Sequence, residues 1–309
     1  MEKRITKSKK FIIVETILLI LIISLLNTSY YYKNKISSTN KFMIDEYNSL
    51  KIKQKAKEIE LTKLKNYHNE YSNIDNEIIN IKEEYFKYIK NLEDDIISGK
   101  SNKKIAYLTF DDGPYYNTYK VLDILDKYNV KATFFTTTTN GMYCYDNKSY
   151  ECFNLYSEYV KRGHTIANHT YTHAIRYGLY SSANSFIKAV KDQEEQVKKY
   201  AYGYITNIVR FPGGSSTAKN LKSSIVEKLR ENHYGYVDWN GSDGDGGMLS
   251  SKDETWNNFT STINEKIEVI LYHDYSRYTT ALLPEMITYL EEKGYILLPL
   301  FYESVVIKK

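Results

Sequence analysis

The chain has 309 residues, a length that allows one large domain or two of ordinary size. Apolar residues make up 42% of the sequence and charged residues 26%, a balance that excludes a collagen-like or wholly disordered chain. The net charge of +4 comes from residues 1–100, with 18 Lys and Arg against 14 Asp and Glu, whereas residues 101–309 hold 24 of each, so the larger part has no basic surplus that would favour a nucleic-acid partner.

The first predicted element is a membrane anchor. Basic residues are concentrated in residues 1–10, and residues 11–32 form a mostly apolar segment that ends in three consecutive tyrosines. The positive-inside rule then places the tail 1–10 in the cytoplasm and everything after Tyr32 outside it, as in a single-pass protein of the cell membrane. A cleaved signal peptide is the competing interpretation, but no small-residue cleavage pattern follows the apolar run.

Residues 33–100 are predicted to form a helical stalk that ends in a hinge. The first 98 residues contain no Gly or Pro, which favours a long helix. From Leu64 to Leu92 apolar and Tyr residues recur at alternating spacings of three and four, the pattern of a coiled coil that would make the protein a homodimer. The alternative is a helix that packs this stripe on the following domain, and the four tyrosines in the stripe keep it open.

Residues 101–309 are predicted to form one α/β domain. Short apolar runs alternate with amphipathic stretches, which indicates a parallel sheet, either open or closed into a barrel. The predicted strands are 105–110, 132–136, 165–169, 208–211, 234–239, 269–272 and 295–300, and the predicted helices include 118–128, 181–202 and 279–293. In such folds the chemistry lies at the carboxyl ends of the strands.

The first and third predicted strands end in candidate metal ligands. Asp111 and Asp112 leave the first strand in different directions, so one can bind a metal while the other faces the reacting water, although Asp-Asp-Gly-Pro is also an ordinary turn sequence. His169 and His173 stand four residues apart, the spacing at which two imidazoles on one helical turn bind Zn²⁺ or a similar cation. An Asp/His/His set leaves open coordination positions, as a hydrolytic site needs.

Later strands end in further candidates. Arg210 could orient a catalytic carboxylate and lower its pKa, and Gly213 could offer its backbone N–H to an oxyanion. His273 has candidate carboxylate partners and could act as a general acid, although a lone histidine is more often structural.

Two other features invite an interpretation. Asp243, Asp245 and Glu254 fit three positions of a calcium loop, but the residues between them do not, so we interpret this segment as a plain surface loop. Cys144 and Cys152 lie eight residues apart, and a local disulfide is favoured if this part lies outside the cytoplasm.

Taken in order, these segments resemble the polysaccharide deacetylase family, also called the NodB-homology domain or carbohydrate esterase family 4. The resemblance covers about residues 103–302. It implies a distorted (β/α) barrel with about seven parallel strands. It also implies removal of acetyl groups from sugars with one divalent cation, most simply Zn²⁺, with Co²⁺, Mn²⁺ or Ni²⁺ as alternatives.

The resemblance gives each candidate a role. Asp111 would be the general base paired with Arg210, and His273 would be the general acid tuned by Asp238. The remaining residues would bind the metal (Asp112, His169 and His173), hold the oxyanion (Gly213) or line the pocket for the acetyl methyl group (Trp239 and Leu271).

The expected substrate is the N-acetylglucosamine of peptidoglycan, because an enzyme tethered outside the membrane meets the cell wall first. An O-acetyl esterase acting on another glycan and a non-catalytic wall-binding protein on the same fold are the alternatives. The third motif of the family corresponds to Arg210–Gly214 in this chain. The family often has a Tyr after the Pro of this motif, where this chain has Gly213-Gly214. This departure affects the expected substrate more than the expected chemistry.

Overall fold

The structure is a computed structural model that describes residues 84, 85, 87–138 and 149–300. The chain divides into two compact units, residues 1–78 and 79–309, and all described residues belong to the second. The predicted anchor 11–32, most of the predicted stalk and Cys144 lie outside the described residues, so the disulfide between Cys144 and Cys152 stays a prediction. Within the described part, no helix is both long enough and apolar enough to cross a membrane.

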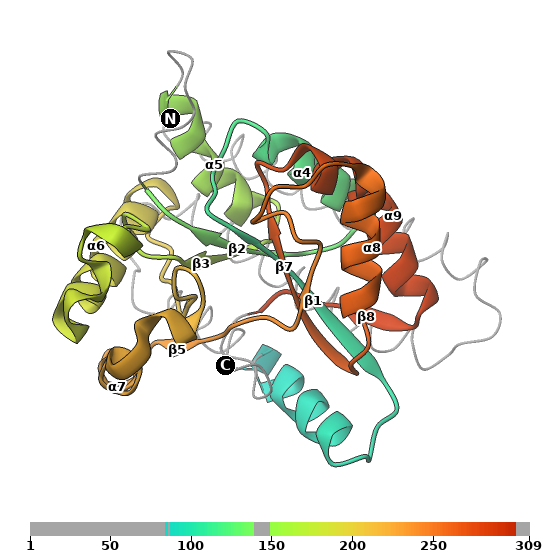
Figure 1. Ribbon diagram of the computed structural model, residues 1–309, viewed down its shortest axis with the longest axis horizontal. Coiled ribbons are helices and arrows are strands. Elements are labelled where there is room, and N and C mark those ends of the chain that lie inside the picture. The colour runs from blue at the N-terminus through green and yellow to red at the C-terminus, as the bar shows by residue number, and fades with distance from the viewer. Residues whose placement is uncertain (1–83, 86, 139–148, 301–309) are drawn as a thin grey trace, which may run out of the picture. The chain divides into compact units, whose positions relative to one another are not determined.

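The second unit is built on one parallel sheet, shown in Figure 1. The strand order is β5-β4-β3-β2-β1-β7-β6, and β8 pairs with the first half of β1. The strands are β1 (Lys104–Asp111), β2 (Thr133–Thr136), β3 (Thr165–Asn168), β4 (Ile208–Val209), β5 (Gly235–Tyr236), β6 (Gly241–Ser242), β7 (Ile267–His273) and β8 (Tyr295–Leu297). Among the described residues nothing pairs β5 with β6, so the barrel is incomplete. The predicted α/β class with parallel strands in a distorted barrel is confirmed.

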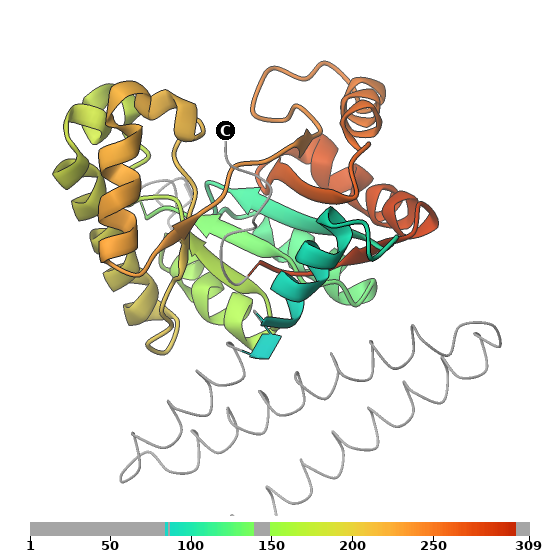
Figure 2. The same ribbon diagram turned by 90° about the horizontal axis from the view of Figure 1, so that it is seen from below.

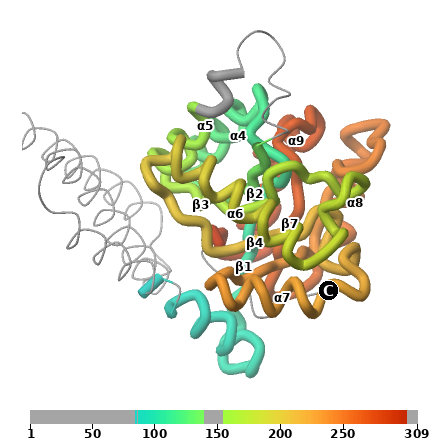
Figure 3. The backbone as a smooth tube through the Cα atoms, turned by 90° about the vertical axis from the view of Figure 1, so that its left-hand side faces the viewer, coloured from blue at the N-terminus to red at the C-terminus, as the bar shows by residue number. Residues whose placement is uncertain are grey.

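The helices pack in a row that follows the order of the strands. Contacts run from α8 through α9, α4, α5 and α6 to α7, and Figures 2 and 3 show this row on the outside of the sheet. The helices are α4 (Thr118–Lys127), α5 (Ser149–Lys161), α6 (Ala183–Tyr200), α7 (Lys222–Glu231), α8 (Lys252–Thr262) and α9 (Arg277–Glu292), with short 3-10 turns η2 (Ile175–Tyr177), η3 (Leu179–Ser181) and η4 (Ser215–Leu221). The side chains of Ser182, Ser251 and Ser276 accept hydrogen bonds from backbone N–H groups of the first turns of α6, α8 and α9, which fixes where these helices begin.

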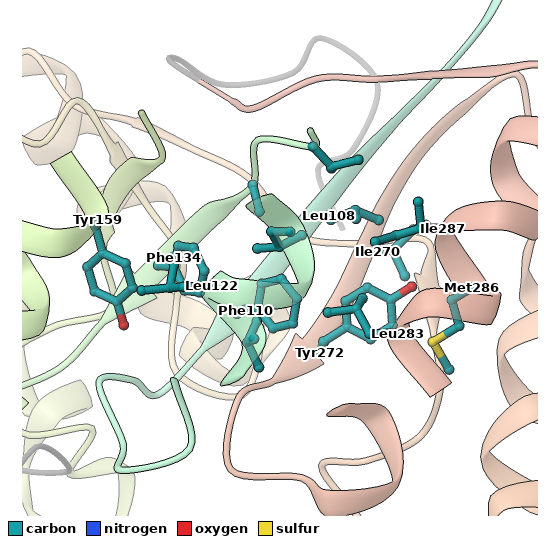
Figure 4. Close-up of a cluster of buried hydrophobic side chains, with 14 of the residues drawn as sticks. Leu108, Phe110, Leu122, Phe134, Tyr159, Ile270, Tyr272, Leu283, Met286 and Ile287 are labelled. Atoms are coloured by element: carbon teal, nitrogen blue, oxygen red, sulfur yellow. The ribbon is translucent and has the colours of Figure 1, made fainter. Parts of the chain in front are cut away.

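The side chains of β1 alternate between two environments, as a strand requires. Leu108 and Phe110 face the helices and join a core with residues of α4 and α9, shown in Figure 4. Tyr107, Thr109 and Asp111 point to the opposite side, the barrel interior, where Thr109 and Asp111 both contact Arg210. We call these three residues, Tyr107, Thr109 and Asp111, the inward column of β1, and it ends at the carboxyl edge of the sheet.

Residues 84, 85 and 87–97 lie before the predicted start of the barrel domain at residue 101. They form a helix that belongs to the barrel unit. The hydroxyl of Tyr107 donates to Glu93 Oε1 at 2.9 Å, and the Tyr85 hydroxyl donates to the carbonyl oxygen of Pro299 at 3.5 Å. In this segment, the stripe predicted as a coiled coil packs on the barrel, the alternative that the tyrosines had kept open.

We expect truncation at Ser101 to destabilise the barrel. A chain that begins at Ser101 lacks the buried side chains of Tyr85, Ile89, Leu92 and Ile96. At about 1.5–3 kcal/mol for each of these four side chains, reduced by about 10–40% for a compact unfolded state, the loss is roughly 4–11 kcal/mol. Thermal unfolding, compared with a chain that begins at Ile79, measures it. Equal melting temperatures and equal solubility of the two chains would contradict this packing.

Candidate active site

A buried ion pair lies at the carboxyl end of β1. Nη1 of Arg210 donates to Asp111 Oδ1 and to Thr109 Oγ1, each at 2.8 Å, and the guanidinium lies 4.0 Å from the centre of the Phe135 ring. Burial raises the pKa of Asp111, and the charge of Arg210 opposes this rise. Since Oδ1 is held by Arg210, the other oxygen of Asp111, Oδ2, is the one that faces His169, 3.7 Å from its Nε2 atom.

Asp112, His169 and His173 converge beside this pair. One ligand atom from each can be chosen so that all three lie within 4.8 Å of one another. Nδ1 of His169 lies 2.8 Å from the carbonyl oxygen of Arg210, and a carbonyl only accepts, so Nδ1 carries the proton and Nε2 keeps its lone pair. Burial, with the charge of His173, lowers the pKa of His169 to about 3, so this ring stays neutral.

This arrangement fits a cation. The lone pair of His169 Nε2 faces Asp112 Oδ1 across 3.6 Å, and this buried oxygen has no hydrogen-bond partner among the described residues. His173 Nε2 lies at the same distance from the same oxygen. Two acceptor atoms with no hydrogen between them are what a divalent metal requires of its ligands.

The backbone that presents these ligands differs from the expected helical turn. Residues 169–174 form no helix, and Asp112, Thr170 and His173 have φ angles of 71°, 65° and 48°, in the left-handed region. Non-glycine residues adopt this conformation at an energetic cost and are enriched at functional sites. The i, i+4 spacing therefore brings the two imidazoles together, with ring centroids 4.9 Å apart, through an irregular turn.

The predicted carboxylate partner of His273 was wrong. Asp245, not Asp238, lies on His273, with Oδ1 2.7 Å from Nδ1 and Oδ2 2.7 Å from the backbone nitrogen. Burial lowers the pKa of His273, but the hydrogen bond and the charge of Asp245 outweigh it and raise the pKa to about 9. The Nε2 atom of His273 lies 3.8 Å from Asp112 Oδ2, so its free nitrogen faces the Asp/His/His cluster.

The prediction of a plain surface loop from Asp243 to Glu254 is wrong for its first part, because Asp243 and Asp245 are both buried. Thr279 Oγ1 lies 2.6 Å from Asp243 Oδ2 and 2.8 Å from Asp245 Oδ2. Burial and the neighbouring Asp245 raise the pKa of Asp243 to about 8. The threonine hydroxyl at the start of α9 thus ties the segment that carries Asp245 in place.

Asp238 holds a different part of the site. Its carboxylate accepts from the backbone N–H of Ser215 at 2.8 Å and from the Ser215 hydroxyl at 2.6 Å. Ser215 follows Gly213 and Gly214, whose φ angles of 74° and 84° suit glycine. Asp238 therefore positions the loop whose Gly213 amide was predicted to hold the oxyanion.

The two predicted pocket residues lie in different surroundings. A Cβ atom on Gly214 would lie 3.1 Å from Trp239 Cη2, so the indole covers the glycine loop. Leu271 is buried in β7, where it pairs in register with Thr109 of β1 and Ser242 of β6. Their contact with an acetyl group stays a prediction.

The importance of Asp245 could have been inferred only from β6. This strand has two residues, one of them a glycine, and shows no hydrophobic periodicity. It pairs with β7, which ends in His273, so the segment that follows β6 reaches His273. Without knowledge of β6, Asp245 cannot be assigned to the carboxyl edge of the sheet beside His273.

A parallel barrel that gathers acids, bases and a glycine loop at the carboxyl edge of its strands has the architecture of an enzyme. Residues 98–230 match the family model described as polysaccharide deacetylase. The solved catalytic domain of a peptidoglycan N-acetylglucosamine deacetylase from Eubacterium rectale is 33% identical, with a TM-score of 0.58, and the match covers 66% of this chain and 94% of that domain. The chain belongs to the polysaccharide deacetylase family.

Two curated relatives agree with this assignment. YheN of Bacillus subtilis is 32% identical over 201 residues, which cover 62% of this chain and 65% of that protein. A peptidoglycan-N-acetylglucosamine deacetylase of Bacillus cereus is 33% identical over 154 residues, which cover 48% of this chain and 51% of that protein. The chain thus spans between half and two thirds of the length of these relatives.

Proposed function

We propose that the protein is a metal-dependent hydrolase that removes N-acetyl groups from a cell-wall polysaccharide, with the N-acetylglucosamine of peptidoglycan as its substrate. The observation that carries the proposal is the pair of facing acceptor atoms, Asp112 Oδ1 and His169 Nε2, between a buried carboxylate and a histidine of raised pKa. The similarity to peptidoglycan N-acetylglucosamine deacetylases supports the choice of substrate.

Asp112, His169 and His173 would hold the cation, with Zn²⁺ as the proposed ion because it favours two imidazoles and one carboxylate. When bound, a divalent cation supplies Lewis-acid polarisation of the acetyl carbonyl and lowers the pKa of the attacking water.

The chain's own residues carry out the proton transfers. Oδ2 of Asp111 takes a proton from the attacking water, while Arg210 holds Oδ1 and fixes the orientation of the carboxylate. The Gly213 N–H, which makes no hydrogen bond within the described residues, donates to the developing oxyanion. Nε2 of His273 then gives its proton to the departing amine, with Asp245 holding Nδ1.

The test is acetate release. Purified protein loaded with Zn²⁺ should release acetate from peptidoglycan and from N-acetylglucosamine oligomers, and removal of the cation with a chelator should abolish the release. Acetate release from O-acetylated xylan alone would favour an esterase. A protein that binds no cation and releases no acetate would be a non-catalytic wall-binding protein.

Replacement of Asp245 by Asn should shift the pH dependence of activity. The amide can still accept from Nδ1 of His273, but it lacks the charge that raises the pKa of His273 to about 9. A general acid works below its pKa, so the alkaline limb of kcat/KM against pH should move to lower pH by about one unit or more. The exposed Asp253 on α8 gives the control variant Asp253→Asn, and an unmoved alkaline limb in Asp245→Asn would contradict the assignment.

We also propose that residues 11–32 anchor the protein in the cell membrane, with the barrel outside the cytoplasm and the heptad stripe before residue 84 as a site of homodimer formation. The basic tail and the apolar run support the anchor. Membrane fractionation of the full chain, with protease added to intact cells, tests the topology. Sedimentation of a chain that begins at Ser37 tests the dimer.

A further inference from the structure

The departing amine must lie next to His273. In the proposed reaction the sugar leaves as the amine, and it needs a proton from the general acid. Asp245 occupies Nδ1 of His273, so only Nε2 can deliver that proton. The sugar ring that carries the acetyl group therefore has to lie on the Nε2 side of His273.

An aromatic side chain packs on the imidazole of His273. The ring of Tyr275 lies against the ring of His273, with centroids 5.0 Å apart and planes tilted by 34°. Tyr115 contacts Tyr275 edge-on, with centroids 5.1 Å apart and an angle of 76°. Tyr115 follows β1 and Tyr275 follows β7, and the two strands pair in register with Asp111 opposite His273, so both tyrosines lie at the catalytic edge.

Packing in the hydrophobic core does not explain the position of Tyr275. It is 39% exposed, and its hydroxyl makes no hydrogen bond within the described residues. Other exposed tyrosines, such as Tyr177 at 88% and Tyr202 at 65%, make no ring contact within the same residues and are ordinary surface groups. Tyr275 differs because Tyr115 and His273 fix its ring while part of it stays open to solvent.

At Cε1 the His273 ring meets a glycine. A Cβ atom on Gly246 would lie 3.1 Å from Cε1 of His273, so the chain is bare backbone there. Gly213-Gly214 likewise leaves the third motif without the aromatic residue that often follows its Pro. Rigid aromatic surfaces suit the apolar C–H faces of sugar rings, and Tyr275 offers one beside the general acid.

We propose that Tyr275, held edge-on by Tyr115, forms the subsite for the pyranose ring whose acetylated amine reacts. The proposal rests on the proposed function, since it places the leaving sugar beside the general acid. The ring of Tyr275 stacks on the sugar and sets its amine toward Nε2 of His273. This subsite selects N-acetylated hexoses over acetyl compounds that lack a sugar.

The test compares two substrates in the full chain. For each variant, kcat/KM is measured for N-acetylglucosamine tetramer and for p-nitrophenyl acetate, which carries an acetyl group without a sugar, and the ratio of the two values is the readout. In Tyr275→Ala the ratio should fall about tenfold, the loss of one aromatic contact of about 1.4 kcal/mol. Tyr275→Phe keeps the ring face and should keep the ratio. Tyr202→Ala is the exposed-tyrosine control.

Binding gives a second readout that needs no turnover. On the Asp111→Asn background, in which turnover should be slow, calorimetry should find that Tyr275→Ala weakens the affinity for the tetramer about tenfold. An unchanged ratio with unchanged affinity would overturn the subsite, as would an equal loss on both substrates, which would mean that Tyr275 only supports His273. A loss in Tyr275→Phe equal to that in Tyr275→Ala would overturn the stacking role.

Failure of the proposed function gives a different result. A wild-type protein that releases no acetate from any glycan overturns that function and the subsite with it. A wild-type protein that is active on the tetramer, next to an unaffected Tyr275→Ala variant, overturns only the subsite.

Discussion

His169→Ala should abolish both metal binding and deacetylation. Two ligands would remain, Asp112 and His173, and two protein ligands hold a divalent cation poorly. The change also removes the hydrogen bond from His169 Nδ1 to the Arg210 carbonyl, which orients the imidazole. Metal content after dialysis and acetate release from N-acetylglucosamine oligomers measure the two effects, and His173→Ala should give the same result.

The matched control is another histidine of the same chain. His233 is exposed beyond the end of α7 and has a φ of 63°, so His233→Asn suits its backbone and should keep both metal and activity. Full metal occupancy in His169→Ala would remove this residue from the ligand set.

Asp111→Asn should keep the metal and lose most of the activity. The amide oxygen can still accept from Arg210 Nη1, which keeps the side chain in place, but the group no longer takes a proton from water. General bases contribute ~10² to 10⁴-fold to turnover, and we expect a loss of that size. Steady-state kinetics and metal content, measured on the same preparation, check the result.

A substitution at Asp112 distinguishes the proposed metal ligand from the proposed general base, Asp111. Asp112→Asn should lower the affinity for the cation, because the unpartnered Oδ1 atom that faces both histidines is then the oxygen or the nitrogen of a neutral amide. Metal loss in Asp111→Asn together with metal retention in Asp112→Asn would show that the two assignments are reversed.

The sequence predicted the parts of the fold that local patterns encode. The strand that ends in Asp111 and the strand that ends in His273 are mostly apolar and buried along nearly their whole length, and both were predicted within two residues of their observed bounds. β5 and β6 are two residues long each, and their pairing depends on neighbouring strands. No local periodicity can encode a strand of that length, so the predicted strand 234–239 was too long and β6 was missed.

Local sequence patterns also predict only part of the candidate site. Asp111, Asp112 and His169 adjoin strand ends and could be placed at one edge from the order of the elements alone. The partner of His273 could not, because Asp238 and Asp245 both follow the same region of the chain and only the pairing of β6 with β7 distinguishes them. The helix that carries Tyr85 and Glu93 likewise has one amphipathic stripe that suits either a second helix or a barrel.

The inward column of β1 joins the N-terminal helix to the chemistry. Tyr107, Thr109 and Asp111 lie on one side of the strand. Tyr107 donates a hydrogen bond to Glu93, and Arg210 donates to both Thr109 and Asp111. Tyr107 and Glu93 are both buried, so the helix that carries Glu93 covers these side chains at the end of the column away from the Arg210–Asp111 pair. A segment that would be discarded as a linker is therefore expected to add to the burial that raises the pKa of Asp111, the proposed general base, and its loss would lower that pKa without removing any residue proposed to meet the substrate.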